Sequence, residues 1–436
     1  MSPGRKFFNL TVYYFIMWLL AGNELLWVLA PKQVKAAEFS LKPSLSVSEE
    51  YNSNLLLTSE NQKEEYITHV VPEIVLHYRT PFWLWDIDYA PEYRTYAKHT
   101  VEDQWAHMLR VRNHTELIDN HLFLDLKEDR ERISRDITRD FAGQSYVVNN
   151  VERNIYSINP YAIITPSTNT SLQPGYIYKN THIFRDARYF FYDTSTAIRP
   201  VVNRTNQIGY ADFNARLFSG VTFTAGGLYN NDENNVEDYE QLEGHTGLEY
   251  AYAPGSRLYA QIAGHRFDFE NDPDPNRHFL WNAGLSQRLS SFKLTLDRTS
   301  LYVQDPERVL TRQDRLRTAI SRDTTRMEFK LSQELNKYRD GKTDALITTS
   351  QDTLASILYR FTERTTATLS AGYQKLRDEP SRALTDINTD SIRLEHLLNK
   401  NFTMNLEYQY LRSHSWDVET NNYINHRFFI GIKKNF

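Results

Sequence analysis

The last fifteen residues, NYINHRFFIGIKKNF (422–436), alternate in character in steps of two. One set of alternate positions is mostly apolar and contains Phe428, Ile430, Ile432 and Phe436. The other set is mostly polar. A period of two over this length predicts a β-strand with one apolar face and one polar face. An ordinary terminal strand of a soluble sheet would show the same pattern, so the tail alone leaves two possibilities.

The terminal aromatic residue favours one of them. Bacterial outer-membrane β-barrels commonly end on a strand that closes the barrel and whose last residue is Phe, and the tail resembles that signal. It departs from it at Lys434, where an aromatic residue is more usual. We therefore predict that Phe428, Ile430, Ile432 and Phe436 form an assembly signal for the barrel assembly machinery.

The first residues predict export. Arg5 and Lys6 precede an apolar run over 7–20, and small residues precede a cleavage site between Ala36 and Ala37. This is the pattern of a secretory signal peptide over 1–36, which leaves a single barrel domain over 37–436. The Asn-Glu pair at 23–24 interrupts the apolar part, so an uncleaved anchor is the alternative.

Composition excludes several classes. There is no Cys, which rules out a lipoprotein anchor, disulfides and thiolate chemistry, and a formal net charge of −5 gives no electrostatic case for nucleic acid. After residue 37 no apolar run approaches the ~20 residues of a membrane helix. Yet there are 28 Tyr and 23 Phe at a mean hydropathy of −0.59. Abundant aromatics at low mean hydropathy suit a barrel in which every second residue meets lipid, although a soluble all-β protein shares them.

The chain is organised as a series of hairpins. Nine tight junctions fall near residues 80, 119, 166, 219, 254, 290, 323, 363 and 399. Ten longer polar stretches lie between them: 52–64, 97–103, 130–150, 180–204, 231–238, 270–277, 303–312, 336–349, 378–389 and 412–421. Because an open sheet rarely exceeds ~10 strands, this predicts a closed antiparallel transmembrane β-barrel of about twenty strands, with eighteen or sixteen still open. The short turns and both termini are expected on the periplasmic side.

Charged residues in the strands indicate which face lines the lumen. A charge on the lipid face near the midplane costs ~2–4 kcal/mol, so the polar register must point inward. The predicted pore-lining residues are Asp86, Asp88, Glu92, Arg94, Asp125, Lys127, Glu243, His245, Glu249, Tyr259, Gln261, His265, Lys293, Asp297, Arg326, Glu328, Lys330, Arg393, Glu395, Asn405 and Glu407. Acidic and basic residues are mixed, which predicts cross-pairing and weak ion selectivity.

Size and aromatic content bear on the cargo. Twenty strands give a backbone diameter of roughly 40 Å, which leaves room for water or an extended polymer unless loops fill it. Phe123, Tyr259, Phe267 and Phe429 fall on the inward register. Aromatic rings there could stack on sugars or fill gaps between lumen side chains.

Some stretches fit the pattern less well. Pro72, Pro160 and Pro174 fall inside runs that otherwise read as strands, and we expect them at bulges or strand ends because proline cannot donate to a ladder. The stretches 130–150 and 180–204 could fold inward and narrow the pore. We expect them instead to be extracellular loops.

The stretches 43–58 and 64–80 resemble the start of a family of bacterial outer-membrane barrels of the putative β-barrel porin type. The matching residues are Pro43, a Tyr51-x-x-Asn54 turn and the internal Pro72. Related barrels accompany exopolysaccharide export and exosortase sorting systems. The resemblance therefore implies an outer-membrane location and periplasmic polysaccharide-export proteins as partners, alongside outer-membrane lipids and lipopolysaccharide.

No enzymatic motif emerges. His245 with Ser256 is the best pair for a lipase, but His245 points away from lipid by parity. The acidic stretches 231–238 and 271–276 lack the spacing of a calcium loop, so no metal or cofactor is predicted. We expect a channel or scaffold that supports exopolysaccharide export. The alternatives are a general diffusion porin and a structural or adhesive surface barrel whose function lies in 130–150 and 180–204.

Overall fold

The computed structural model describes residues 37–138, 145, 147–148, 150–184, 201–379, 381–416 and 422–436. The predicted signal segment 1–36, including Ala36, lies outside these residues. Over the part of the chain that is described, no helix is long and apolar enough to cross a membrane.

Twenty-one labelled strands form one sheet. They are β1 (Glu38–Asn52), β2 (Glu65–Arg79), β3 (Trp83–Tyr96), β4 (Gln104–Ile118), β5 (Leu122–Ser134), β6 (Asn150–Ala162), β7 (Ile164–Ser167), β8 (Thr170–Phe184), β9 (Arg204–Phe218), β10 (Val221–Asn234), β11 (Tyr239–Ala253), β12 (Ser256–Phe269), β13 (Asn276–Leu289), β14 (Phe292–Asp305), β15 (Arg308–Asp323), β16 (Met327–Asp340), β17 (Leu346–Thr362), β18 (Thr365–Asp378), β19 (Leu384–Asn399), β20 (Phe402–Ser415) and β21 (Tyr423–Asn435). Because β6 and β7 both pair with β8 and continue one line, they form one strand of the wall, which makes twenty.

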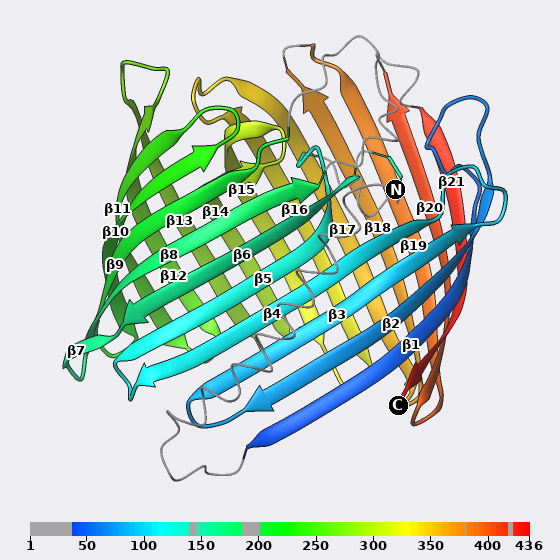
Figure 1. Ribbon diagram of the computed structural model, residues 1–436, viewed down its shortest axis with the longest axis horizontal. Coiled ribbons are helices and arrows are strands. Elements are labelled where there is room, and N and C mark those ends of the chain that lie inside the picture. Colours follow the sequence, from blue (N-terminus) through cyan, green and yellow to red (C-terminus); the bar gives the residue numbers. More distant parts are fainter. Residues whose placement is uncertain are drawn as a thin grey trace, which may run out of the picture.

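The sheet closes on itself. Each wall strand pairs antiparallel with the next, and β1 pairs with β21 from Ser44↔Asn435 to Asn52↔Arg427. Closure removes the two sheet edges that would otherwise expose unpaired backbone groups. The prediction of a closed antiparallel barrel of about twenty strands is confirmed (Figure 1).

The two ends of the barrel differ, as the hairpin spacing predicts. One end carries the tight turns, among them Gly220 and Gly255, whose φ angles of 79° and 75° fall in the left-handed region that glycine tolerates. The start of β1 and the terminal Phe436 lie at this turn end (Figure 1). The other, the loop end, carries the longer connections.

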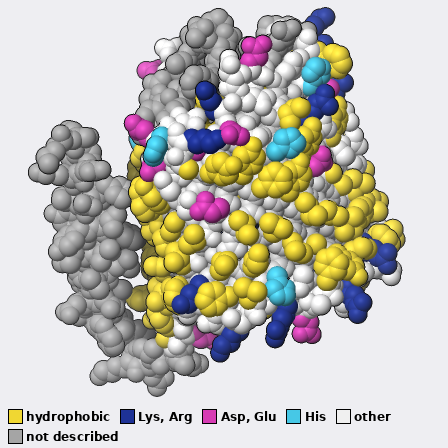
Figure 2. Space-filling model, turned by 90° about the vertical axis from the view of Figure 1, so that its right-hand side faces the viewer, with side chains coloured by type: hydrophobic (Ala, Val, Ile, Leu, Met, Phe, Trp, Pro, Cys, Tyr) yellow, Lys and Arg dark blue, Asp and Glu magenta, His cyan; other side chains and the backbone are white. Residues whose placement is uncertain are grey.

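The outer face is apolar. Leu45, Val47, Ile392, Leu406 and Ile430 are among many large apolar side chains that stay exposed on it. On the side formed by β19–β21 and β1, hydrophobic side chains cover the middle, and most charged ones lie toward the two ends (Figure 2). Such a surface is suited to lipid rather than water.

Lys434 also has a place on this outer face. Its Nζ lies 4.6 Å from the ring centroid of Phe436 and 5.7 Å from that of Phe402, at the turn end. A cation over aromatic rings is stabilised by the ring quadrupole. The departure from the usual aromatic residue therefore keeps an aromatic contact at the end of the last strand.

The three unusual prolines lie inside strands, which corrects the expectation of strand ends. The β2–β3 ladder has no pairs between Val70↔Tyr93 and Ile74↔Tyr89, the stretch that contains Pro72. The β6–β8 ladder likewise lacks pairs around Pro160. Pro174 keeps its place opposite Ala211 in the β8–β9 ladder. On its other side Pro174 falls between the pairs Tyr161↔Gly175 and Ile164↔Leu172 and has no partner. Each proline therefore lies where one neighbouring ladder is interrupted, so that its missing N–H leaves no ladder hydrogen bond unmade.

Candidate functional site: a lumen closed at the loop end

The predicted pore-lining residues share one face of the wall. In the strand register, all except Arg326 fall on the face opposite the exposed apolar residues. Arg326 instead lies in the short turn between β15 and β16, where its carbonyl accepts the Arg360 N–H at 2.8 Å. The alternation of polar and apolar residues predicts Arg326 on a wall strand because it does not show at which residue β16 begins.

Opposite charges pair on this inner face. Arg393 bonds to Glu407 at 2.6 Å, Arg112 to Asp129 at 2.6 Å, and Glu328 contacts Lys330. The first two pairs join neighbouring strands and stabilise them, the third lies within β16, and in all three the opposite charges offset each other. The lumen wall therefore carries a balanced set of charges over these strands.

A histidine-rich patch lies on β11 and β12. Glu243 is 3.4 Å from both His245 and His265, and His245 is 3.4 Å from Asp212. Within the described residues no group of three or more His, Asp or Glu side chains is placed to hold a metal ion. The Ser256 hydroxyl accepts the Arg288 N–H at 3.0 Å and has no printed contact with His245.

β14 separates from its neighbour β13 over the loop-side half of the β14–β15 hairpin. The β13–β14 ladder runs from Leu289↔Phe292 only to Ala283↔Arg298, although β13 begins at Asn276 and β14 extends to Asp305. The β14–β15 ladder continues to Asp305↔Arg308, and β15 stays paired with β16 up to Thr311↔Asp340. The upper half of this hairpin is therefore paired internally but detached from β13.

The detached half packs against the inside of the neighbouring wall. Tyr302 places its ring 4.7 Å from that of Phe267 and 5.2 Å from that of His265, both on the inner face of β12. Leu310 joins a buried cluster with Phe267 and Tyr239. By parity Tyr302 belongs to the outward register of β14, so it can meet the inside of β12 only because the hairpin has moved into the lumen.

The tip of this hairpin reaches β9. The Val202 N–H donates to the Pro306 carbonyl at 2.8 Å, and the Arg204 guanidinium donates to the carbonyls of Val309 and Arg308 at 3.0 and 3.2 Å. Stretch 303–312 was expected to be an external loop. It is instead the end of an in-folded hairpin whose turn contains only Pro306 and Glu307.

A second segment crosses the lumen from the other side. The β4–β5 ladder ends at Leu109↔Arg130, while β5 continues to Ser134. Beyond β5, Arg135 forms an ion pair with Glu307 at the tip of the first hairpin. The Gln374 side chain on β18 donates to the Thr138 carbonyl at 3.4 Å. Residues from distant parts of the wall thus meet inside the barrel.

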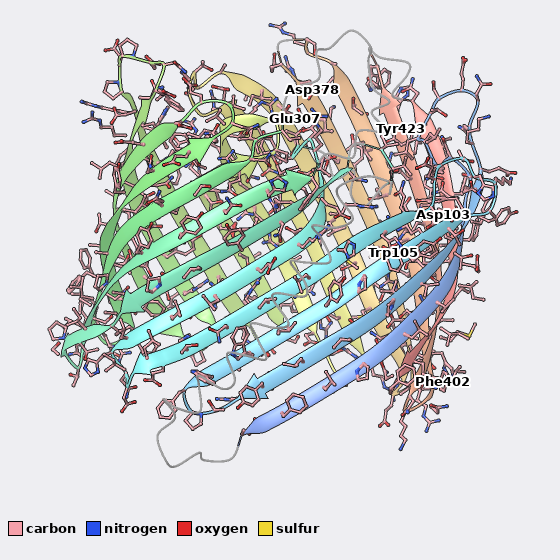
Figure 3. All side chains as sticks on the ribbon, viewed as in Figure 1. Asp103, Trp105, Glu307, Asp378, Phe402 and Tyr423 are labelled. Carbon is pink, nitrogen blue, oxygen red and sulfur yellow. The ribbon has the colours of Figure 1, made fainter. Side chains whose placement is uncertain are left out.

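The β1–β2 connection closes a third part of the lumen. Leu57 and Val148 pack in one buried cluster with wall residues of β18–β21 (Leu376, Ile387, Leu411 and Tyr423). Glu307, Asp378 and Tyr423 lie toward this end of the barrel, opposite Phe402 (Figure 3). The expectation that 130–150 is an extracellular loop is wrong for residues 135, 138, 145, 147 and 148, which are buried. Most of 180–204 lies outside the described residues.

The Tyr51-x-x-Asn54 turn has a structural role here. Asn54 is buried, its Nδ2 donates to the Thr58 carbonyl at 2.8 Å and its Oδ1 accepts the Thr58 N–H at 3.0 Å. The Asn54 N–H donates to the Asn425 side chain at 3.0 Å, which ties the loop to β21. One asparagine therefore directs this connection inward.

Several charged side chains lie close together where the two lumen-crossing segments meet. Burial raises the pKa of Glu307, and the neighbouring carboxylates Asp136 and Asp305 raise it further, whereas Arg135 lowers it. Arg135 is thus the cation that offsets the charge of Glu307, while Arg308 pairs with Asp305 at 3.0 Å. Removing its charge should drive the segments apart.

A buried ionic network joins the first and last strands. Glu50 on β1 bonds to Arg427 on β21 at 2.7 Å and to His69 on β2 at 2.9 Å. His69 also contacts Glu92 on β3 at 2.6 Å, and Glu92 contacts Arg94. The network spans the line along which the barrel closes.

Several of these residues are not among the predicted pore-lining residues. Glu50, His69 and Arg427 all lie on the polar register of their strands, so parity could have found them. Nothing in the sequence indicates that Arg135 meets Glu307, because the contact depends on the β14–β15 turn and the segment after β5 both lying inside the lumen.

Comparison with known proteins supports the fold. No family model and no curated protein matches the sequence. Among solved structures, a variant of the ferric enterobactin receptor PfeA from Pseudomonas aeruginosa aligns with a TM-score of 0.53 at 10% identity, over 93% of this chain and 82% of that one. The siderophore receptor PirA from Acinetobacter baumannii gives 0.53 at 9% identity, over 93% and 81%. The copper transporter OprC gives 0.51 at 9% identity, over 93% and 81%.

At these identities the likeness is one of fold. The chain has the fold of outer-membrane β-barrels and is an outer-membrane protein by that fold and by its apolar outer face. None of the three neighbours is described as a polysaccharide exporter. The link to exopolysaccharide systems remains a prediction from residues 43–80.

Proposed function

We propose that the barrel is a gated conduit for a large hydrophilic cargo, held closed at the loop end until a partner acts on it. The observation that carries the proposal is the meeting of two segments inside the lumen through Arg135 and Glu307, with Thr138 bonded to Gln374 on the wall strand β18 beyond them. A constitutively open lumen would have no need for chain that crosses it.

The chain packed inside the lumen favours this proposal over a general diffusion porin. A porin depends on an unobstructed water-filled passage. Here buried apolar clusters containing Leu57, Val148 and Leu310 occupy the loop end. Purified protein should therefore conduct little.

For the cargo we propose exopolysaccharide. The resemblance at residues 43–80 supports this class, as do a charge-balanced wall and inward-facing aromatics such as Tyr259 and Phe429. Sugar rings stack on aromatic faces, and balanced charge suits a polymer of either sign. The structural neighbours are named as siderophore receptors and a copper transporter, so a small metal-bearing cargo is the competing candidate.

The cargo is tested in a strain that lacks the gene. We expect polysaccharide to be missing from the cell surface or retained in the periplasm, with recovery on complementation. Uptake of iron and copper in the same strain is measured alongside. Normal surface polysaccharide with impaired metal uptake would replace the exopolysaccharide cargo by the metal-bearing one and leave a conduit in place.

Closure is tested by charge reversal. Arg135→Glu places a fourth carboxylate beside Glu307, Asp136 and Asp305, whose repulsion in a buried setting should separate the two segments. We expect the single-channel conductance in planar bilayers to rise at least severalfold over wild type. The double exchange Arg135→Glu with Glu307→Arg restores opposite charges and should restore the low conductance.

A matched control reverses a charge that lies on the wall. Arg393→Glu breaks the pair with Glu407 but moves no segment out of the lumen. Its conductance should stay near that of wild type. Each variant is first checked for a heat-modifiable band, so that only folded barrels are compared. A folded Arg135→Glu barrel that conducts like wild type would contradict closure by these segments.

A further inference from the structure

The wall is interrupted between β13 and β14. Residues 276–282 of β13 pair with β12 on one side, but the ladder with β14 stops at Ala283↔Arg298. Backbone groups at a sheet edge that are shielded from water destabilise the fold when they are left without partners. An interruption of this length is therefore costly to maintain.

Side chains satisfy part of this edge. The Arg298 guanidinium donates to the Trp281 carbonyl at 3.2 Å and stacks at 3.8 Å from the Trp281 ring. The Ser300 N–H donates to the Asn282 side chain at 2.6 Å. Arg298 lies on the outward register, so it is an exception to the rule that charges face the lumen. Arg298 forms the last pair of the β13–β14 ladder, where its guanidinium can donate to the Trp281 carbonyl that β14 no longer pairs with.

We propose that the upper half of the β14–β15 hairpin is the gate of the conduit, and that it opens by returning to the wall and pairing with residues 276–282 of β13. The inference rests on the proposed function, since it supplies the moving part of that conduit. In the open state the edge of β13 that has no ladder in the closed state pairs with residues 299–305 of the same chain.

The register of the existing ladder fixes the pairs of the open state. Continued without a shift, it places Trp281 opposite Ser300, Phe279 opposite Tyr302 and Arg277 opposite Gln304. Parity is preserved, so Tyr302 would look outward beside the exposed Phe279. An outward Tyr and Phe toward one end of the wall fit the aromatic girdle of a membrane interface.

The same side chains hold the closed state. Tyr302 packs on Phe267 and His265, Pro306 accepts the Val202 N–H, and Glu307 pairs with Arg135. Opening exchanges these contacts for the backbone ladder with β13. Two alternative sets of contacts for one hairpin are what a two-state element needs.

Engineered cysteine pairs can report each state, because the natural chain contains no Cys. Val202→Cys with Pro306→Cys reports the closed state, where the two backbones are hydrogen-bonded at 2.8 Å. Phe279→Cys with Tyr302→Cys reports the open state. In the closed state Tyr302 lies beside His278 on the inner face of β13, with ring centroids 6.0 Å apart, whereas Phe279 is exposed on the outer face. Leu285→Cys with Leu296→Cys joins strands that are paired in both states and serves as the control.

We expect the 202–306 disulfide to form readily in otherwise wild-type barrels in membranes and the 279–302 disulfide to form poorly. Adding Arg135→Glu should raise the yield of the 279–302 disulfide at least severalfold and lower that of 202–306. Barrels locked at 279–302 should keep a high conductance that falls again after reduction.

The combined outcomes distinguish a failure of the gate inference from a failure of the conduit proposal. If Arg135→Glu raises the conductance while 279–302 fails to link and the 285–296 control links fully, the gate inference is overturned and the conduit stands. If neither conductance nor cross-linking changes, both are overturned. Full 279–302 linkage without Arg135→Glu would place the hairpin in the wall at rest, which overturns the gate as a closed-state element.

Discussion

Replacing Ile430 and Ile432 with Asp is expected to leave almost no folded protein in the outer membrane. Both side chains lie on the lipid face of β21, 49% and 48% exposed. Each carboxylate costs about 2 kcal/mol near the middle of the apolar layer, toward the low end for charged residues. Together they remove a large part of the 5–15 kcal/mol that typically stabilises a folded protein. The heat-modifiable band of outer-membrane fractions should fall at least tenfold.

The control places the same charge on the other face of the same hairpin. Thr403 on β20 is inward-facing and lies opposite Lys433, so Thr403→Asp gains a cation as its neighbour. Its folded level should match wild type. Deleting Phe436, whose N–H donates to the Pro43 carbonyl at 3.0 Å, should also reduce folded protein. Normal levels of the double Asp variant would mean that the assigned lipid face is wrong.

Replacing Glu50 with Ala should produce the largest loss of stability from a single substitution inside the lumen. Glu50 is 1% exposed and is the carboxylate partner of both Arg427 and His69. Its removal leaves the Arg427 cation buried without that carboxylate, and breaking a buried pair in this way costs about 3–5 kcal/mol. We expect the urea midpoint of unfolding, followed by tryptophan fluorescence in lipid vesicles, to fall clearly below that of wild type.

Glu49→Ala is the matched comparison. Glu49 is the next residue of β1 but lies on the exposed outer face, where it only accepts the Thr68 hydroxyl at 2.8 Å. An exposed hydrogen bond contributes about 1 kcal/mol. The midpoint should therefore move little. Equal shifts for the two substitutions would show that the network across β1, β2 and β21 does not stabilise closure.

Both of these predictions concern the junction between β21 and β1, where the barrel closes. Ile430 and Ile432 face lipid on β21, while Arg427 on the same strand faces inward to Glu50. The first pair of residues tests whether the strand inserts, and Glu50 tests what stabilises its junction with β1. Neither substitution touches the detached hairpin, so their outcomes do not depend on the gate.

Local alternation was enough to predict the wall. Side chains on a strand alternate between faces with a period of two, so the sequence around Ile430 or Glu407 shows which residue meets lipid without reference to any other strand. The tight turns near 219 and 254 carry glycines at positive φ, a preference that is also local. Strand number followed from counting these turns.

The closed loop end could not be predicted this way. Residues 303–312 are polar enough to resemble an external loop, and parity assigns Tyr302 to the lipid face. Whether the hairpin lies in the wall or in the lumen depends on contacts with β9, β12 and the segment after β5. Those partners are separated from it by many residues. Alternation along a strand depends only on adjacent residues, so it does not indicate contacts with distant ones.

The positions of the strands, the face each side chain takes, the turn end and the membrane-facing surface can thus be read from the sequence, because each depends on neighbours one or two residues away. The contact of Arg135 with Glu307, the link of Glu50 between β1 and β21, and the edge of β13 that has no ladder with β14 follow from the folded arrangement of the strands. These features arise from how a closed sheet brings distant strands together. The physical reason is that backbone pairing and ion pairing act through space, whereas alternation acts along the chain.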